Sequence, residues 1–198
     1  FVYRNLQQYA VAAQPKRKHT PFRIVYAGLL GVAQDIYSII ENIPFQSIGA
    51  EFHLYGGGNQ TEKIKEYINK HPGCFVYYHG YVKKEQIAEE LSRYDASIVP
   101  LTVAIKGAVP SKIYDLIPIG IPILFCGGGE GAEIVSKYYF GMVSKPHDFK
   151  QLHNNIIELI NLPDEEYSTI SKNCLDMAKN EFDFNKQISR CYDFIKSI

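Results

Sequence analysis

Glycines that could form a phosphate-binding edge occur at three places, each directly after a short apolar run. They are Gly28 and Gly31, then Gly56 and Gly57, and finally the GGGEG segment at 127–131. Glycine lets the backbone approach a ligand closely, and the N–H groups at a helix start favour an anion. Each turn alone is also what a tight strand-to-helix connection requires. Together on one sheet edge, the three turns favour a diphosphate site.

A second candidate for anion recognition is the segment VPSKIYD at 109–115. Pro110 suits the first turn of a helix, whose free N–H groups can bind an anionic oxygen together with the hydroxyl of Ser111. Lys112 adds a positive charge. Asp115 lies about one turn further on, where a carboxylate can accept hydrogen bonds from a ribose or sugar diol. The alternatives are a solvated surface lysine and an acid that merely suits the helix start.

Several catalytic and metal-binding patterns are missing from the sequence. No G-x-G-x-x-G follows the first apolar run, and there is neither a P-loop nor a G-x-S-x-G elbow, which argues against a conventional dehydrogenase, kinase or hydrolase. The four cysteines are too widely spaced for a zinc pattern, so we interpret them as buried, reduced thiols. His53 and His79 are interpreted as strand residues. We expect no metal and no other cofactor.

Composition and charge narrow the class of protein. The 198 residues are 46% hydrophobic and 21% charged, and the formal net charge is zero. This charge balance argues against a nucleic-acid partner and against direct attraction to an anionic membrane. No apolar run approaches the roughly 20 residues that span a bilayer. The basic run at 16–19 is interpreted as a solvated linker. The absence of a signal peptide and a start at Phe1 suggest part of a longer, cytoplasmic chain.

Apolar runs and amphipathic stretches alternate along most of the chain. Strands are predicted at 23–28, 51–56, 74–80, 96–101, 121–126 and 140–144. Helices are predicted at 32–42, 60–70, 83–94, 110–119, 131–138, 148–161, 163–180 and 184–197. This alternation predicts an α/β fold: a doubly wound, Rossmann-like parallel sheet of about six strands with helices on both faces and a helical C-terminal tail.

We divide the chain into an N-terminal helix and linker (1–20), a Rossmann-like domain (21–180) and a C-terminal helix (181–198). The first segment would connect to a preceding domain. The last helix carries an apolar stripe of Phe184, Ile188, Cys191, Tyr192 and Ile195. We expect this stripe to pack on residues 1–13 or on a second copy of the chain, which would make a dimer.

Six motifs, in order, resemble the C-terminal, donor-binding half of GT-B glycosyltransferases, family 4 in particular. They are AGLLGVAQD at 27–35, LYGGG at 54–58, HGYVKKEQIAEEL at 79–91, YDASIVPL at 94–101, VPSKIYDLIPIGIPIL at 109–124 and GGEGAEIV at 128–135. The resemblance implies a bacterial, retaining transferase that uses a nucleoside-diphosphate sugar, with UDP preferred, in surface polysaccharide synthesis. The acceptor, a glycan or a lipid-linked sugar, would bind a separate N-terminal domain. Only that domain or the acceptor would bring the enzyme to the inner face of the cytoplasmic membrane.

The resemblance also implies roles for individual residues. Gly28 and Gly31 would approach the diphosphate, and Gly56 and Gly57 would line the nucleotide pocket. Backbone groups of the segment His79, Gly80, Tyr81 and Val82 would contact the base. Asp115 would bind the ribose. Glu130, next to Gly131, would be the remaining acid near the sugar or phosphate, so the catalytic candidates are Lys112, Asp115 and Glu130.

The sequence also departs from the family pattern. The first acid of the family's two-glutamate motif is Gly107 here, and the family's basic pair falls near Ala33 and Gln34. Lys112 is the obvious replacement cation. Two other functions therefore stay open, a nucleotide-sugar 2-epimerase and a binding module without chemistry. Alone, the chain is expected to bind a donor nucleotide and to transfer nothing.

Overall fold

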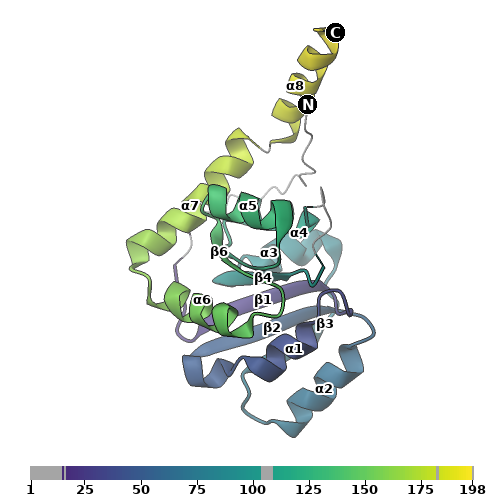
Figure 1. Ribbon diagram of the computed structural model, residues 1–198, viewed down its shortest axis with the longest axis vertical. Helices are drawn as coiled ribbons and strands as arrows, with labels where there is room; N and C mark the ends of the chain where they lie inside the picture. The colour runs from purple at the N-terminus through teal and green to yellow at the C-terminus, as the bar shows by residue number, and fades with distance from the viewer. Residues whose placement is uncertain (1–14, 16, 104–108, 182, 198) are drawn as a thin grey trace.

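Six parallel strands form one sheet, in the order β3-β2-β1-β4-β5-β6 (Figure 1). The computed structural model describes residue 15 and residues 17–103, 109–181 and 183–197. The strands are β1 (Phe22–Leu29), β2 (Ala50–Gly57), β3 (Val76–Gly80), β4 (Ala96–Pro100), β5 (Ile123–Cys126) and β6 (Gly141–Ser144). The chain direction across the sheet reverses between β1 and β4, and ligands of such sheets bind near this switch point. The predicted fold class is confirmed.

Helices cover both faces of the sheet. The α-helices are α1 (Ile36–Asn42), α2 (Thr61–Lys70), α3 (Ile87–Leu91), α4 (Ser111–Leu116), α5 (Gly129–Lys137), α6 (Phe149–Asn161), α7 (Asp164–Asn180) and α8 (Phe184–Lys196). Short 3₁₀ helices are η1 (Phe45–Ile48), η2 (Lys84–Gln86) and η3 (Ile117–Ile119). Apolar side chains of α1, α2 and α6 pack in one core cluster, those of α3, α4 and α5 pack in another, and α7 contributes to both.

Alternation along the strands explains the two clusters. In β1, Ile24 and Tyr26 face the first cluster while Val25 faces the second, and all three side chains are fully buried. In β5, Leu124 and Phe125 divide in the same way. Successive strand residues point to opposite faces, so a strand buried on both sides must be apolar throughout. This is why the central strands appear in the sequence as continuous apolar runs.

Two helices are shorter than the periodicity predicts. The helix predicted from residue 32 begins at Ile36, because Asp35 has a left-handed backbone conformation (φ 44°). The backbone N–H groups of Gln34 and Asp35 both donate to the Gly31 carbonyl and close a turn before the helix. The helix predicted at 83–94 consists of η2 followed by α3, which ends at Leu91. In contrast, α5 begins at Gly129, two residues earlier than predicted.

The segment just before β1 is attached to the sheet rather than solvated. The ammonium of Lys18 donates to the carbonyls of Ile160 (2.9 Å) and Leu162 at the end of α6. His19 donates its backbone N–H to the fully buried carboxylate of Asp95. The interpretation as a solvated linker was therefore wrong for Lys18, whereas His19 is exposed and contacts Asp95. The helix predicted within 1–13, and Lys16, lie outside the described residues.

Helix α8 extends away from the sheet (Figure 1), with Ile188, Tyr192 and Ile195 exposed. The partner expected for this stripe stays a prediction. Within the described residues, no helix combines the length and apolar character needed to cross a bilayer. Cys126 and Cys174 are buried thiols, as expected, and burial raises the pKa of Cys126 to about 12. Cys74 and Cys191 are only half-buried.

Candidate functional site

A pocket of about 500 Å³ opens at the carboxyl ends of β1 and β2, close to the switch point of the sheet. Helices α3 and α4 and the loop that leads into η2 form its other walls. The residues that line it are Ala27, Gly28, Leu29, Tyr55, Gly56, Gly57, Tyr81, Val82, Lys84, Ile87, Leu91, Ser97, Lys112, Asp115 and Leu116. A mostly apolar wall with a few polar groups is typical of small-molecule sites.

The pocket brings together half of the residues that the sequence analysis singled out. The residues that line it are Gly28, Gly56, Gly57, Tyr81, Val82, Lys112 and Asp115. The residues that lie outside its lining are Gly31, His79, Gly80, Pro110, Ser111, Glu130 and Gly131. These seven residues come from four separate parts of the chain, so the fold itself assembles this site.

The predicted glycine turns, at Gly28 and at Gly56 and Gly57, form the last residues of β1 and β2, where they are packed directly against each other. Gly56 has φ 112°, and a Cβ atom on it would lie 2.0 Å from the carbonyl oxygen of Gly28. The backbone N–H of Leu30 donates to the carbonyl oxygen of Gly57 at 3.0 Å, which joins the two turns. Only glycine fits such a contact at such a φ angle. The close approach therefore explains why glycine occupies the wall of the pocket.

Lys112 reaches from α4 to the end of β1. Its Nζ atom donates to the carbonyl oxygen of Ala27 and lies 5.5 Å from the ring centroid of Tyr26. A Cβ atom on Gly28 would lie 2.4 Å from this Nζ atom, so the glycine leaves room for the lysine. Burial lowers the pKa of Lys112, and the charge of Asp115 partly opposes that shift. Lys112 is thus half-buried against the turn and is not a solvated surface lysine.

Asp115 faces the same pocket from the next turn of α4. Burial raises the pKa of its carboxyl group, while the ammonium groups of Lys112 and Lys84 lower it. Lys84, at the start of η2, also lines the pocket. The pocket therefore combines two cations with one carboxylate, a set that can bind an anion and hydrogen-bond a hydroxyl group.

The sequence analysis missed three polar members of this lining. Tyr55 directly precedes Gly56, and its hydroxyl contacts the hydroxyl of Tyr94 at 2.7 Å and a carboxylate oxygen of Glu90 at 2.6 Å. Ser97 is buried in β4 and has the pattern of a core strand residue. Lys84 was detectable from sequence, because it follows Val82 by only two positions.

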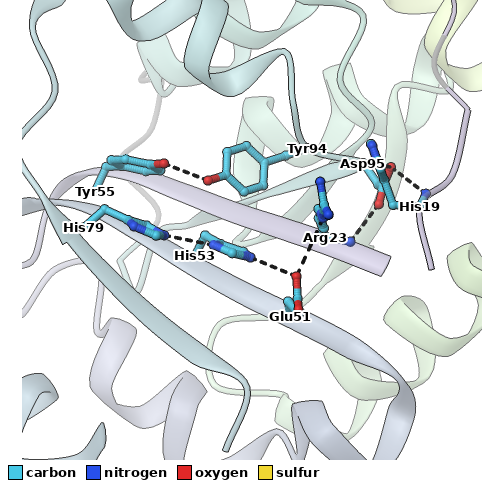
Figure 2. Close-up of polar contacts among 8 residues, drawn as sticks. All are labelled: His19, Arg23, Glu51, His53, Tyr55, His79, Tyr94 and Asp95. Atoms are coloured by element: carbon cyan, nitrogen blue, oxygen red, sulfur yellow. Dashed lines mark hydrogen bonds and ion pairs between the residues drawn. The ribbon is translucent and has the colours of Figure 1, made fainter. Parts of the chain in front are cut away.

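The ring of His79 belongs to a polar chain that runs along the sheet away from the pocket (Figure 2). It stacks on Tyr55, with centroids 4.7 Å apart, and its Nε2 atom lies 2.9 Å from Nδ1 of His53. His53 in turn contacts Glu51 at 3.3 Å, and Glu51 pairs with Arg23 at 3.7 Å. The pocket wall formed by Tyr81 and Val82 therefore begins two residues after a histidine that is held by the sheet.

The other residues that were predicted to bind phosphate lie at the starts of α4 and α5. They are Pro110, Ser111, Glu130 and Gly131. A Cβ atom on Gly131 would meet the Phe125 ring at 2.7 Å and Cδ of Pro110 at 3.2 Å, so α5 packs tightly against that point. Ser111 is exposed and Glu130 is half-buried. Among the described residues, no group of three His, Cys, Asp or Glu side chains could hold a metal ion.

Comparison with known proteins places the chain in a family. The sequence model of "Glycosyl transferases group 1" matches residues 21–162, more than two thirds of the chain. The chain belongs to the group 1 glycosyltransferases. No curated protein sequence matches it significantly.

Solved structures of glycosyltransferases share the fold. A mutant of Staphylococcus aureus TarM, in complex with fondaparinux, α-GlcNAc-glycerol and UDP, is 16% identical with a TM-score of 0.76, and the match covers 98% of this chain and 38% of TarM. Anabaena Alr3699/HepE, in complex with UDP and glucose, is 17% identical with a TM-score of 0.71, and the match covers 89% of this chain and 48% of HepE. The catalytic domain of cholesterol-α-glucosyltransferase from Helicobacter pylori is 18% identical with a TM-score of 0.61, and the match covers 81% of this chain and 99% of that domain.

The chain spans less than half the length of TarM and of HepE. Its fold is that of one half of a GT-B glycosyltransferase. The sequence resemblance implied a missing basic pair near Ala33 and Gln34, and the cations in the pocket lining are Lys84 and Lys112. Gly107, where the resemblance implied a missing acid, lies outside the described residues.

Proposed function

We propose that this chain is the donor-binding half of a retaining glycosyltransferase that uses a nucleoside-diphosphate sugar, with UDP as the preferred nucleotide. The observation that carries the proposal is that Lys112 and Asp115 face one pocket between two glycine turns, in a chain of the group 1 family. TarM and HepE have both been solved in complex with UDP, which supports this choice of nucleotide.

Each part of the ligand has a matching part of the pocket. The diphosphate lies against the turn at Gly28, where the ammonium of Lys112 supplies the charge. The ribose hydroxyls donate to the carboxylate of Asp115. The base enters the apolar wall of Tyr81 and Val82, beyond the turn of Gly56 and Gly57.

The chemistry that fits this site is positioning and charge stabilisation. The bond between the sugar's anomeric carbon and the diphosphate oxygen breaks, a bond forms from that carbon to the acceptor's hydroxyl oxygen, and the hydroxyl proton is released. Negative charge grows on the leaving diphosphate. Lys112 stabilises that charge from a half-buried position, where a charge acts more strongly than in water. We propose that no metal and no other cofactor takes part. A separate domain supplies the acceptor, a glycan or lipid-linked sugar of a surface polysaccharide.

The two alternatives receive unequal support. An epimerase needs ionisable groups around the sugar, but the candidates His79 and Glu130 lie outside the pocket lining. A binding module without chemistry is supported by the missing family cations and by Gly107 in place of an acid.

Ligand binding and turnover are tested separately. We expect UDP to raise the melting temperature of this chain more than GDP, ADP or uridine does. A ligand at 100 times its dissociation constant adds about 2.7 kcal/mol to the free energy of unfolding, so the ligand that binds most tightly at a given concentration stabilises the chain most. The full-length parent is then incubated with a panel of nucleotide sugars. Transfer to an acceptor supports the proposal, whereas epimer formation, or binding without turnover, supports one of the alternatives. A chain that no nucleotide stabilises would remove the donor-binding role itself.

A further inference from the structure

Tyr26 lies behind the pocket wall and contacts the turn that forms it. The side chain is fully buried in the middle of β1 and does not line the pocket. Its hydroxyl donates to the carbonyl oxygen of Leu29 at 2.7 Å. The bond spans the turn at Gly28, which is the point where β1 meets the pocket. Tyr26 therefore holds the backbone on both sides of the glycine.

The same side chain also supports the cation. Nζ of Lys112 lies 5.5 Å from the centroid of the Tyr26 ring, within the range of a cation–π contact. A Cβ atom on Gly28 would lie 2.4 Å from that Nζ atom and 3.1 Å from the Tyr26 hydroxyl. The glycine, the lysine and the tyrosine therefore share one small space, and moving any of them displaces the others.

The tyrosine hydroxyl is well suited to this position. Burial raises the pKa of Tyr26, so the hydroxyl keeps its proton and remains a donor well above neutral pH. Phenylalanine would fill the same volume but leave the Leu29 carbonyl without this donor. A buried Tyr at this point adds a directional bond that an apolar core residue cannot supply.

The second glycine turn has the same arrangement. Tyr78, in β3, donates its hydroxyl to the carbonyl oxygen of Gly56 at 2.8 Å. Like Tyr26, it does not line the pocket. Two tyrosine hydroxyls thus hold the two turns that meet at the pocket, each from the strand side.

We propose that Tyr26 is a positioning residue for diphosphate binding: its hydroxyl fixes the turn at Gly28, and its ring holds the ammonium of Lys112 beside that turn. This inference rests on the proposed function, because it assumes that the turn receives the diphosphate of a nucleotide. Tyr78 fixes the neighbouring turn in the same way.

The chain offers a matched control. Tyr167 is also fully buried and donates its hydroxyl to a backbone carbonyl, that of Asp95, at 2.7 Å. Asp95 precedes β4 and therefore lies at the opposite end of the sheet from the pocket. Tyr167→Phe and Tyr26→Phe each remove one buried hydroxyl and are expected to lower the melting temperature similarly.

The test compares Tyr26→Phe, Tyr167→Phe and the parent chain in titrations with UDP, pyrophosphate and uridine. We expect Tyr26→Phe to weaken UDP and pyrophosphate binding about two- to tenfold, the range that one hydrogen bond covers, and to leave uridine unaffected. Tyr167→Phe is expected to bind all three ligands like the parent. Tyr26→Leu lacks the ring, so the Lys112 ammonium loses its cation–π contact. As pH rises, the pyrophosphate affinity of this variant is therefore expected to decline at a lower pH than that of the parent.

The outcomes separate the two proposals. If the parent binds UDP, and Tyr26→Phe binds both UDP and pyrophosphate as tightly as the parent does, the positioning role is wrong while the proposed function stands. Equal losses for uridine and pyrophosphate would mean general loosening of the pocket and would also overturn the positioning role. If the parent binds neither UDP nor pyrophosphate, the proposed function fails, and the positioning role fails with it.

Discussion

Nδ1 of His53 lies 2.9 Å from Nε2 of His79, and the two imidazole rings are parallel to within 4° (Figure 2). A contact between two ring nitrogens requires one donor and one acceptor, so at least one of the rings must be neutral. Burial lowers the pKa of His53, Glu51 opposes this shift, and the charge of His79 adds to it. The pKa of His79 is also lowered by burial, and Tyr55 covers one face of its ring.

This pair predicts a loss of stability in mild acid. An unfolded histidine titrates near pH 6.5, and the folded pair binds protons only at lower pH. Between these values the unfolded chain holds more protons, so the free energy of unfolding falls as pH drops through about 6.5. Urea unfolding from pH 5 to 8 measures this slope. His79→Gln is expected to flatten it, whereas His71→Gln, which changes a histidine at the end of α2, is not. An unchanged slope in His79→Gln would disprove that this histidine pair causes the loss of stability in mild acid.

Lys112→Ala is expected to weaken binding of both UDP and pyrophosphate about tenfold or more. A charge-assisted hydrogen bond is worth roughly 1.5–3 kcal/mol, and each 1.4 kcal/mol is a factor of ten. Added salt should narrow the difference, because the site is partly open to solvent. For the parent, affinity should also decline as pH rises toward the lowered pKa of Lys112. Titration calorimetry measures all three effects. Parent-like affinity for both ligands would remove the phosphate role of Lys112.

Asp115→Asn is expected to act on a different part of the ligand. The amide keeps the shape and one acceptor oxygen but loses the charge that favours ribose hydroxyls as donors. UDP should therefore bind less tightly, by about 1 kcal/mol, whereas pyrophosphate should bind as before or slightly better. The same calorimetric titrations provide the comparison. Equal weakening of UDP and pyrophosphate would contradict a ribose-binding role.

Gly56→Ala is expected to be far more damaging than Gly73→Ala. Both glycines have positive φ angles, 112° and 85°, so alanine is strained at each. A Cβ atom on Gly73 has no neighbour within 4 Å, whereas one on Gly56 would lie 2.0 Å from the oxygen of Gly28. We expect Gly73→Ala to cost about 1–2 kcal/mol of unfolding free energy, and Gly56→Ala to cost more and to abolish UDP binding. Urea unfolding with UDP titration tests this, and similar costs would refute the close contact of the two turns.

The sheet and much of the pocket were predictable from the sequence. Continuous apolar strands and alternating helices follow from a sheet buried on both faces, and Lys112 and Asp115 lie three residues apart on one helix, so they share a face. Ser111, one turn before Asp115 on the same helix, was predicted to join them, but its short side chain is exposed and does not line the pocket. The longer side chain of Lys112 reaches the carbonyl oxygen of Ala27.

Other members of the site could not be found from local patterns. Tyr55 and Tyr26 are ordinary strand residues in the sequence, and only the fold brings Glu90 and Tyr94 to the hydroxyl of Tyr55 and the ammonium of Lys112 to the ring of Tyr26. The position of Glu130 depends on where α5 begins, and a start at Gly129 packs this end of the helix on Phe125 and Pro110. Such contacts are formed by residues distant in sequence.

Hydrogen exchange with and without UDP tests the central claim most directly, namely that the pocket at the ends of β1 and β2 binds a nucleoside diphosphate. We expect UDP to slow amide exchange at 27–30, 55–58, 80–84 and 112–116, and to leave α6 and α7 unchanged. The expected protection covers the two glycine turns, the loop after β3 and the helix that carries Lys112. Unchanged exchange in these four segments at millimolar UDP, or protection confined to other parts of the chain, would contradict the account.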